Sequence, residues 1–381
     1  MTSVIEHEEY FTTLPREYYL SQEIFDREID QIFTQQWHYV AHESEIPRKG
    51  DYVTVQLVGE SVMITRDQNL AVNAMLTACR HRGHSVCSNA SGNARRFVCP
   101  YHNWSFGLDG RLLKAPTIDD VSVGGPIEYS EFGLFPVQVD VWQGMIFVCL
   151  SKEPKEPISP VLDDIARDVL PLEPARMKKA YELTYEVDAN WKSLIENFLE
   201  CYHCTGNHPE LCEPMDLDAT VESSIRPAVE VYGGGLPLKT GMKTLSPNGE
   251  VMSRPLLGTL ENGAEIPDAF GAGFGIQPFF TRAFFHVDHA VIHSIRPVEP
   301  GHVQWVTRWF VHEDAVEGTD YNVDDLTSMW KVTNEQDIAL LTEAFRGVKS
   351  RHWTPGPLSA AKEPAIKSAL SQYLLMMDAP S

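Results

Sequence analysis

The chain has 381 residues, enough for two or three domains with cores of their own. Hydrophobic residues make up 43% of it, which is typical of a globular protein and not of a disordered one. The formal charge of −22 argues against binding to nucleic acid or to an anionic membrane surface, because both require a basic patch.

The compartment is indicated by hydropathy and cysteine content. No apolar run is as long as a membrane span, and the first ten residues are polar and acidic, unlike a signal peptide. Seven cysteines, an odd number, favour a reducing environment in which they serve as ligands or core residues and not as disulfides. We therefore expect a cytoplasmic protein without a membrane partner.

The N-terminal part is predicted to be helical and is followed by a β region. Residues 21–36 have a good N-cap in Ser21 and one apolar face, so they favour a helix. From residue 37 to 150 the sequence consists of short β runs, interrupted by loops at 79–92 and 99–111.

Three prolines between residues 154 and 160 indicate a linker, after which the pattern is mixed α and β to the end. We expect three parts. They are an N-terminal helical segment at 1–40 that packs on the last domain, a β domain at 41–153, and an α+β domain at 154–381.

The two loops of the β region each contain one cysteine and one histidine. The first has Cys79 and His81 in a C-x-H pattern, and the second has Cys99 and His102 in a C-x-x-H pattern. If the loops face each other, the thiolates can bind one iron and the imidazoles another, which is the ligation of a Rieske 2Fe–2S cluster. A Cys₂His₂ zinc site is the alternative, but zinc sites usually pair Cys with Cys and His with His.

A second group of ligands follows residue 190. Residues 190–203 are predicted to form a helix, on which Glu200 and His203 are surface neighbours. A glycine and a proline then break the helix and bring His208 round from a loop. Two histidines and one carboxylate form the facial triad of non-haem Fe(II) oxygenases, which leaves positions open for O₂ and substrate.

A carboxylate for this triad is expected on a later helix, at about 325–346. Asp337 lies within the apolar stripe of that helix, whereas Glu335 and Glu343 lie off it. A buried carboxylate is costly unless it is paired or bound to a metal. The stripe alone leaves two interpretations of Asp337 open, a metal ligand and a buried, hydrogen-bonded aspartate.

These motifs resemble those of the Rieske non-haem iron oxygenase α subunits. The similar segments are CRHRGHSVC, CPYHNWSFGLDG, NWKSLIENFLECYHCTGNHPEL and NEQDIALLTEAFRGV, and the resemblance extends from about Ile24 to Leu375. It implies an α+β protein in which an all-β Rieske domain precedes a helix-grip catalytic domain with an antiparallel sheet. It also implies a head-to-tail homotrimer and Asp337 as the third iron ligand. Asn103 departs from the glycine that is frequent in the family.

Glu200 is a second departure, because most ring-hydroxylating members have aspartate there. Carnitine monooxygenase and related quaternary-ammonium oxygenases resemble this chain in having glutamate. In the family this acidic residue links the two iron sites across a subunit boundary. A carboxylate with two oxygens can accept hydrogen bonds from His203 and from His102 of a neighbouring subunit. The alternative is an ordinary surface glutamate.

The resemblance implies the terminal oxygenase of a monooxygenase system that uses O₂ and two electrons. The chain has no G-x-G-x-x-G loop, so NADH is expected to act indirectly, through a separate flavin and iron–sulfur reductase. The expected substrate is a small quaternary ammonium compound that undergoes N-demethylation or C–N cleavage. The alternatives are an aromatic ring-hydroxylating dioxygenase, an aromatic O- or N-demethylase, and an electron-transfer Rieske protein, which would leave the triad unexplained.

A cationic substrate would be bound by aromatic faces. The candidates are dense in one region, where they are equally typical of the core of a sheet: Phe270, Phe274, Phe279, Phe280, Phe284, Phe285, Trp305 and Trp309. Arg282 or Arg308 is a candidate partner for a substrate carboxylate, and either residue is also compatible with a solvated strand position.

Overall fold

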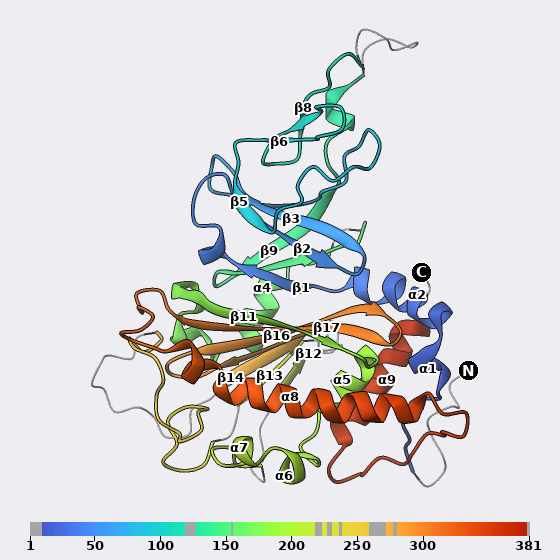
Figure 1. Cartoon of the computed structure of the whole chain (residues 1–381), viewed down its shortest axis with the longest axis vertical. Helices are drawn as coiled ribbons and strands as arrows, with labels where there is room; N and C mark the ends of the chain where they lie inside the picture. Colours follow the sequence, from blue (N-terminus) through green and yellow to red (C-terminus); the bar gives the residue numbers. More distant parts are fainter. Residues whose placement is uncertain are drawn as a thin grey trace. The chain divides into compact units, whose positions relative to one another are not determined.

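The computed structural model describes residues 10–118, 127–153, 155–217, 223–226, 231–235, 238–258, 272–276 and 280–378. The chain divides into two compact units (Figure 1). One is Gln35–Ile158, and the other combines Met1–Thr34 with Ser159–Ser381. Two of the sequence-based candidates for an aromatic cage, Phe270 and Phe279, lie outside the described residues.

The first unit is an all-β domain. Among its described residues, seven strands form one antiparallel sheet in the order β1-β10-β9-β4-β3-β2-β5. Their bounds are β1 His38–His42, β2 Asp51–Leu57, β3 Glu60–Arg66, β4 Val72–Leu76, β5 Ser91–Asn93, β9 Pro136–Trp142 and β10 Met145–Cys149. A smaller sheet contains β6 Phe97–Val98, β7 Ser105–Phe106 and β8 Leu112–Lys114.

The second unit is built on a long antiparallel sheet. Its described strands have the order β11-β17-β16-β15-β14-β13-β12. Their bounds are β11 Met177–Val187, β12 Ser223–Arg226, β13 Val231–Gly235, β14 Ala272–Ile276, β15 Thr281–Phe285, β16 Ala290–Glu299 and β17 His302–His312. The strands β16 and β17 are almost entirely buried at their centres, as expected for a sheet covered by helices.

This unit also contains helices, of which α4, α5 and α8 contact the sheet (Figure 1). Their bounds are α1 Glu17–Leu20, α2 Gln22–Gln31, α4 Ser159–Ile165, α5 Trp191–Phe198, α6 Cys204–Asn207, α7 Pro209–Cys212, α8 Val323–Val348 and α9 Pro364–Asp378. The long helix α8 contributes Leu326, Met329 and Trp330 to a core that also contains Val291 and Trp309 of the sheet. The unit thus combines helices with an antiparallel sheet, and the α+β prediction is confirmed.

Two of the predicted helices begin close to the expected residue, although α2 ends at Gln31 and only a short 3₁₀ helix, Phe33–Gln35, follows it before residue 36. The side chain of Ser21 accepts a hydrogen bond from the backbone N–H of Ile24, so it is the N-cap of α2. Asn322 caps α8 in the same way. Asp337 is buried on the inner face of α8, whereas Glu335 and Glu343 are exposed. In the described part of the chain, no helix combines the length and apolar character needed to cross a bilayer.

Candidate metal centres

The first candidate centre lies between the two loops of the β unit. Cys79 and Cys99 are buried in one cluster, and the ring nitrogens Nδ1 of His81 and His102 lie 3.1 Å apart. Two tight turns produce this arrangement. The backbone N–H of Gly83 donates to the backbone oxygen of Cys79, and the backbone N–H of Asn103 donates to the backbone oxygen of Cys99. The four side chains are thus presented as a thiol pair and an imidazole pair.

Asn103 occupies the second turn with a φ of 59°. This is the left-handed region, which favours glycine and which asparagine tolerates better than most other residues. The departure from the family's glycine therefore preserves the turn. The loop still directs the His102 ring toward His81.

The electrostatics of these loops suit a cluster. Burial, together with the contact to the Cys99 thiol, raises the pKa of Cys79. Desolvation and the nearby charges of His81 and Arg82 lower the pKa of His102. The imidazole is therefore neutral and able to bind iron, while the buried Cys79 thiol requires positive charge nearby to become a thiolate. A 2Fe–2S cluster would supply that charge, so these residues fit it.

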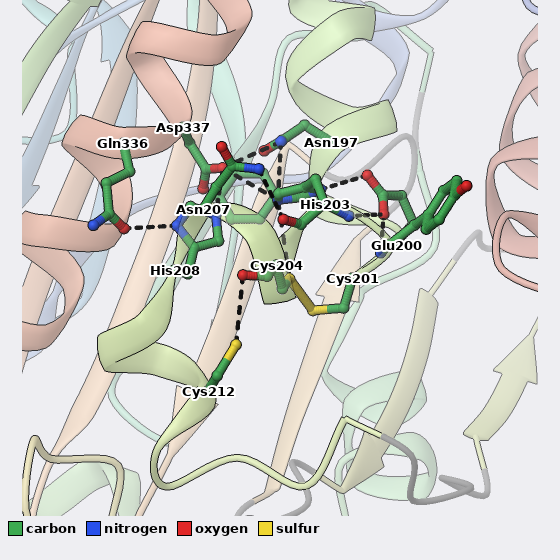
Figure 2. The surroundings of a disulfide bond; sticks show 12 residues. Asn197, Glu200, Cys201, His203, Cys204, Asn207, His208, Cys212, Gln336 and Asp337 are labelled. Carbon is green, nitrogen blue, oxygen red and sulfur yellow. Dashed lines mark hydrogen bonds and ion pairs between the residues drawn. A yellow bond between two sulfur atoms is a disulfide. The ribbon is translucent and has the colours of Figure 1, made fainter.

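The second candidate centre lies in the other unit, where three residues from distant segments converge (Figure 2). The Oδ1 atom of Asp337 lies 3.0 Å from Nε2 of His208 and 3.3 Å from Nε2 of His203. His208 is buried between α6 and α7, His203 precedes α6, and Asp337 lies on α8. All three proposed ligands are brought together.

The second nitrogen of each imidazole is held by another side chain (Figure 2). Nδ1 of His203 lies 2.5 Å from Oε1 of Glu200, and Nδ1 of His208 lies 2.7 Å from Oε1 of Gln336. Such outer contacts fix the orientation of metal-binding histidines, with Nδ1 protonated and Nε2 left for the metal. Glu200 is thus in contact with His203, as expected.

The carboxylates at this centre favour a bound cation. Burial alone would raise the pKa of Asp337, but hydrogen bonds from both histidines hold it below its usual value. Burial would also lower the pKa of His203, yet the contacts to Asp337 and Glu200 raise it to about 9. Protons on imidazole balance the carboxylates here, and a divalent metal ion can replace them. Two histidines and a carboxylate fit a mononuclear iron.

One prediction about the backbone is wrong. Residues 190–203 do not form a single helix, because α5 ends at Phe198 and a turn follows. In that turn the carboxylate of Glu200 accepts hydrogen bonds from the backbone N–H groups of Tyr202 and His203. These local bonds compete with helical ones and start a new turn. Glu200 and His203 therefore meet through the turn and not along a helix.

The expectation that no cysteine forms a disulfide is also wrong. Cys201 and Cys204 are joined by a disulfide that brackets His203 (Figure 2). Their Cα atoms lie 4.8 Å apart, within the range for such bonds, because the backbone N–H of Cys204 donates to the oxygen of Cys201 and closes a turn. The C-x-x-C pattern was the available signal. The ligand atoms of His203, Cys204 and His208 lie within 4.8 Å of one another, but a disulfide sulfur is not a thiolate ligand.

A cavity of about 90 Å³ adjoins the three proposed ligands. Its lining combines polar groups from the centre with apolar side chains. The apolar and cationic members are Phe198, Leu211, Met215, Arg282, Phe284 and Trp330. Of the described aromatic residues proposed as a cage, only Phe284 lines this cavity, and the helices α5 and α8 supply Phe198 and Trp330.

The two candidate arginines differ in environment. Arg282 lines the cavity. Arg308 is buried and forms an ion pair with Glu182 at 2.8 Å, and this pairing, together with Lys179, lowers the pKa of Glu182 to about 2 against the effect of burial. The charge of Arg308 is therefore already compensated, and only Arg282 is placed to meet a substrate.

Sequence reasoning missed one polar residue at the centre. The Nδ2 atom of Asn197 lies 3.2 Å from Oδ1 of Asp337 and 3.3 Å from Nε2 of His203. Asn197 is on α5, two turns from its N-cap, among residues that otherwise form an apolar face. A polar residue on that face was the signal that could have identified it.

Comparison with protein families gives two matches. Residues 174–379 match the family described as the ring hydroxylating alpha subunit (catalytic domain), and residues 36–125 match the Rieske [2Fe-2S] domain. The glycine betaine monooxygenase oxygenase subunit of Pseudomonas aeruginosa is 32% identical over 393 residues, which cover 95% of this chain and 88% of the relative. The carnitine monooxygenase oxygenase subunit of Escherichia coli is 32% identical over 208 residues, or 54% of each chain.

Solved structures share the fold. A quaternary ammonium Rieske monooxygenase in complex with L-carnitine superimposes with a TM-score of 0.75 and 23% identity, covering 96% of this chain and 95% of that one. Naphthalene 1,2-dioxygenase with indole bound superimposes with a TM-score of 0.77 and 19% identity, covering 100% and 94%.

Proposed function

Because this chain belongs to the family of ring-hydroxylating Rieske oxygenase α subunits, it is an oxidoreductase that incorporates molecular oxygen, and we propose that its substrate is a small quaternary ammonium compound. One observation carries the proposal. The cavity beside His203, His208 and Asp337 is lined by the aromatic rings of Phe198, Phe284 and Trp330. Aromatic faces attract a quaternary ammonium group, and tryptophan does so most strongly.

The relatives support the same substrate class. Those that match this chain include glycine betaine and carnitine monooxygenase oxygenase subunits and an N,N-dimethyl phenylurea N-demethylase α subunit from Sphingobium. The first two names give quaternary ammonium substrates, and the third implies attack on a carbon bonded to nitrogen. We infer that this chain likewise hydroxylates a carbon next to nitrogen, which leads to N-demethylation or C–N cleavage.

The chain's own residues bind and orient the groups involved. Cys79, His81, Cys99 and His102 would hold the 2Fe–2S cluster. When bound, the cluster and the mononuclear iron supply electron transfer and O₂ activation. NADH acts through a separate reductase, as is characteristic of the family.

At the mononuclear site, His203, His208 and Asp337 would hold the iron on one face, and the cavity side remains for O₂ and substrate. Glu200 and Gln336 keep Nδ1 of the two imidazoles occupied, so that Nε2 of each points to the metal position. For an N-methyl substrate, one oxygen atom enters a C–H bond and the other leaves as water. The hydroxymethyl ammonium product then releases formaldehyde and a proton, and NADH supplies the two electrons.

Assembly and location complete the proposal. We infer a head-to-tail homotrimer, in which Glu200 accepts one hydrogen bond from His203 and one from His102 of the neighbouring subunit. The contact of Glu200 with His203 supports the first half of this bridge. We place the protein in the cytoplasm, where NADH is available to the reductase.

The test is turnover with a generic reductase, NADH and O₂. Glycine betaine, choline and L-carnitine are compared with aromatic acids, and NADH consumption and formaldehyde are measured. We expect an ammonium compound to be turned over with NADH consumption, giving about one formaldehyde per NADH if it is N-demethylated and a free amine without formaldehyde if another C–N bond is cleaved. Replacing its N⁺ by neutral carbon should weaken binding roughly thirtyfold, since a desolvated cation–π contact contributes about 2 kcal/mol. Turnover of aromatic acids alone would instead favour an aromatic ring dioxygenase or demethylase.

A further inference from the structure

The cavity at the mononuclear site is lined by a cationic side chain, Arg282, that forms no ion pair with a carboxylate of the described residues. Arg282 lines it and donates one N–H to the backbone oxygen of Phe198. The guanidinium carbon lies 5.1 Å from the ring centre of Phe198 and 5.2 Å from that of Phe284, so the two rings hold it in place. Within the described part of the chain, no aspartate or glutamate forms an ion pair with Arg282. The remaining N–H groups of the guanidinium are available to a ligand.

A second donor belongs to the same cavity wall. Trp330 is only 6% exposed and lines the cavity, with its ring stacked at 5.2 Å on that of Phe284. Its indole N–H has no acceptor among the described residues. An indole nitrogen can only donate a hydrogen bond, and a buried donor without a partner is destabilising.

A third donor lies behind these rings. His293 is the cross-strand neighbour of Arg282, so both side chains lie on the same face of the sheet. Its ring packs edge to face on that of Trp330, with centres 4.7 Å apart. The Nε1–H of Trp305 donates to Nδ1 of His293 at 3.0 Å, so Nδ1 carries no proton.

The proton of His293 is therefore on the other nitrogen. Burial, and then the charge of Arg282, lower the pKa of His293 to about 3, which keeps the ring neutral. A neutral ring with Nδ1 as acceptor carries its hydrogen on Nε2. That N–H has no partner among the described residues, but His293 is not one of the residues that line the cavity.

We propose that Arg282 binds a carboxylate group of the substrate, with Trp330 as a further hydrogen-bond donor. Arg282 retains N–H groups beyond the one that binds Phe198, and the indole N–H of Trp330 in the same cavity wall has no acceptor among the described residues. A carboxylate can accept two parallel bonds from a guanidinium. The inference rests on the proposed function, which assigns a quaternary ammonium group to the substrate. A substrate with both this group and a carboxylate is a zwitterion. Its carboxylate faces Arg282, and its ammonium group lies toward the metal ligands of the same cavity, where the carbon bonded to nitrogen must react.

The arrangement also selects against other ammonium compounds. A simple cation such as choline brings a positive charge toward Arg282 and offers no carboxylate. The repulsion is not compensated, since Arg282 has no counter-ion among the described residues. A betaine therefore should bind more tightly than the corresponding alcohol.

The experiment is calorimetric titration of the holoenzyme without reductase, so that no turnover occurs. Three probes separate the two ends of the ligand. Glycine betaine has both charges, choline has only the ammonium group, and 3,3-dimethylbutyrate has only the carboxylate. Arg282→Gln should weaken binding of both carboxylates about tenfold to a hundredfold, and that of choline not at all. Lys331→Gln, which removes a cation on α8 outside the cavity lining, should change none of the three.

A second variant keeps the test decisive if Arg282→Gln does not fold. Arg282→Lys retains the charge but not the planar pair of donors. Its affinity for glycine betaine should fall, while its affinity for choline should not. Equal loss for choline and glycine betaine in either variant would overturn the assignment of Arg282.

A different result of the same titrations would contradict the proposed function. If the wild-type enzyme binds 3,3-dimethylbutyrate as tightly as glycine betaine, the positive charge on nitrogen contributes nothing and the ammonium proposal is wrong. The carboxylate contact of Arg282 is still judged in that case, from the affinity of the two Arg282 variants for 3,3-dimethylbutyrate.

Discussion

Lys192 and Glu28 form an ion pair of 2.5 Å in which each side chain is only 1% exposed. Glu28 also accepts hydrogen bonds from the indole of Trp191 and the hydroxyl of Tyr373, each at 2.7 Å. One carboxylate thus joins α2, α5 and α9. Burial lowers the pKa of Lys192, against the effect of Glu28. The pair therefore attaches the start of α5, the helix that precedes the mononuclear centre, to α2.

Glu28→Gln should therefore destabilise the protein strongly. Removing one partner leaves the other charge buried and unpaired, which typically costs about 3–5 kcal/mol of unfolding free energy. Denaturant unfolding measures the change. Glu23→Gln on the exposed side of the same helix is the control and should cost less than about 1 kcal/mol. A loss of similar size in both variants would contradict the role given to the buried pair.

Cys99→Ser should abolish the 2Fe–2S cluster, because a serine oxygen is a poor substitute for a thiolate bound to iron. The visible Rieske spectrum and the two cluster irons should be lost. Cys87 is a nearby cysteine that donates weakly to the backbone oxygen of Asn89, and Cys87→Ser should keep the spectrum. A normal spectrum for Cys99→Ser would remove this residue from the proposed ligands.

Alanine at His208 or Asp337 should remove only the mononuclear iron. The cluster spectrum should persist, iron should fall from about three to about two per chain, and activity should be lost. Glu335→Ala, at an exposed position of the same helix, should retain all of the iron. If Asp337→Ala also retains it, another carboxylate is the ligand.

Glu196 predicts a pH dependence of stability. Burial raises its pKa from 4.5 to about 7, against the effects of its 2.7 Å hydrogen bond from Tyr19 and of Lys192. The folded state then holds a proton that the unfolded state releases between these values. The unfolding free energy should fall as the pH rises from about 4.5 to about 7, and then remain constant.

The variant Glu196→Gln isolates this contribution. Glutamine retains an acceptor oxygen for Tyr19 but cannot ionise. Above pH 7 the variant should be more stable than the wild type, and the difference should vanish toward pH 4.5. Unfolding curves measured across this range test the expectation, which is refuted if the two proteins keep a constant difference.

Glu200→Gln tests the proposed bridge between the iron sites. Glutamine keeps the size of the side chain but has one acceptor oxygen, so one imidazole N–H loses its partner. The variant should fold, form the trimer and bind all of its iron, yet turn over very slowly. In a single turnover the reduced cluster should fail to reoxidise at the wild-type rate. Normal reoxidation would show that the bridge is unnecessary, and loss of the mononuclear iron alone would make Glu200 a ligand.

Local sequence was sufficient for several features of this protein. The C-x-H and C-x-x-H loops, the spacing of His203 and His208, and the place of Asp337 in an apolar stripe are all patterns within short segments. Their chemistry depends on residue type and spacing, which can be read without knowing the fold. Membership in the oxygenase family follows from the same motifs.

Other features depended on how distant segments pack. Nothing near Arg282 or Arg308 in sequence indicates that the first lines a cavity while the second pairs with Glu182. The sequence indicates only that Trp330 belongs to the apolar face of α8. Its stacking on Phe284, a residue of the sheet, is seen only in the tertiary structure. Cross-strand register and helix–sheet contacts decide which side chains share a cavity, and these are long-range relationships that a residue's neighbours in the chain do not encode.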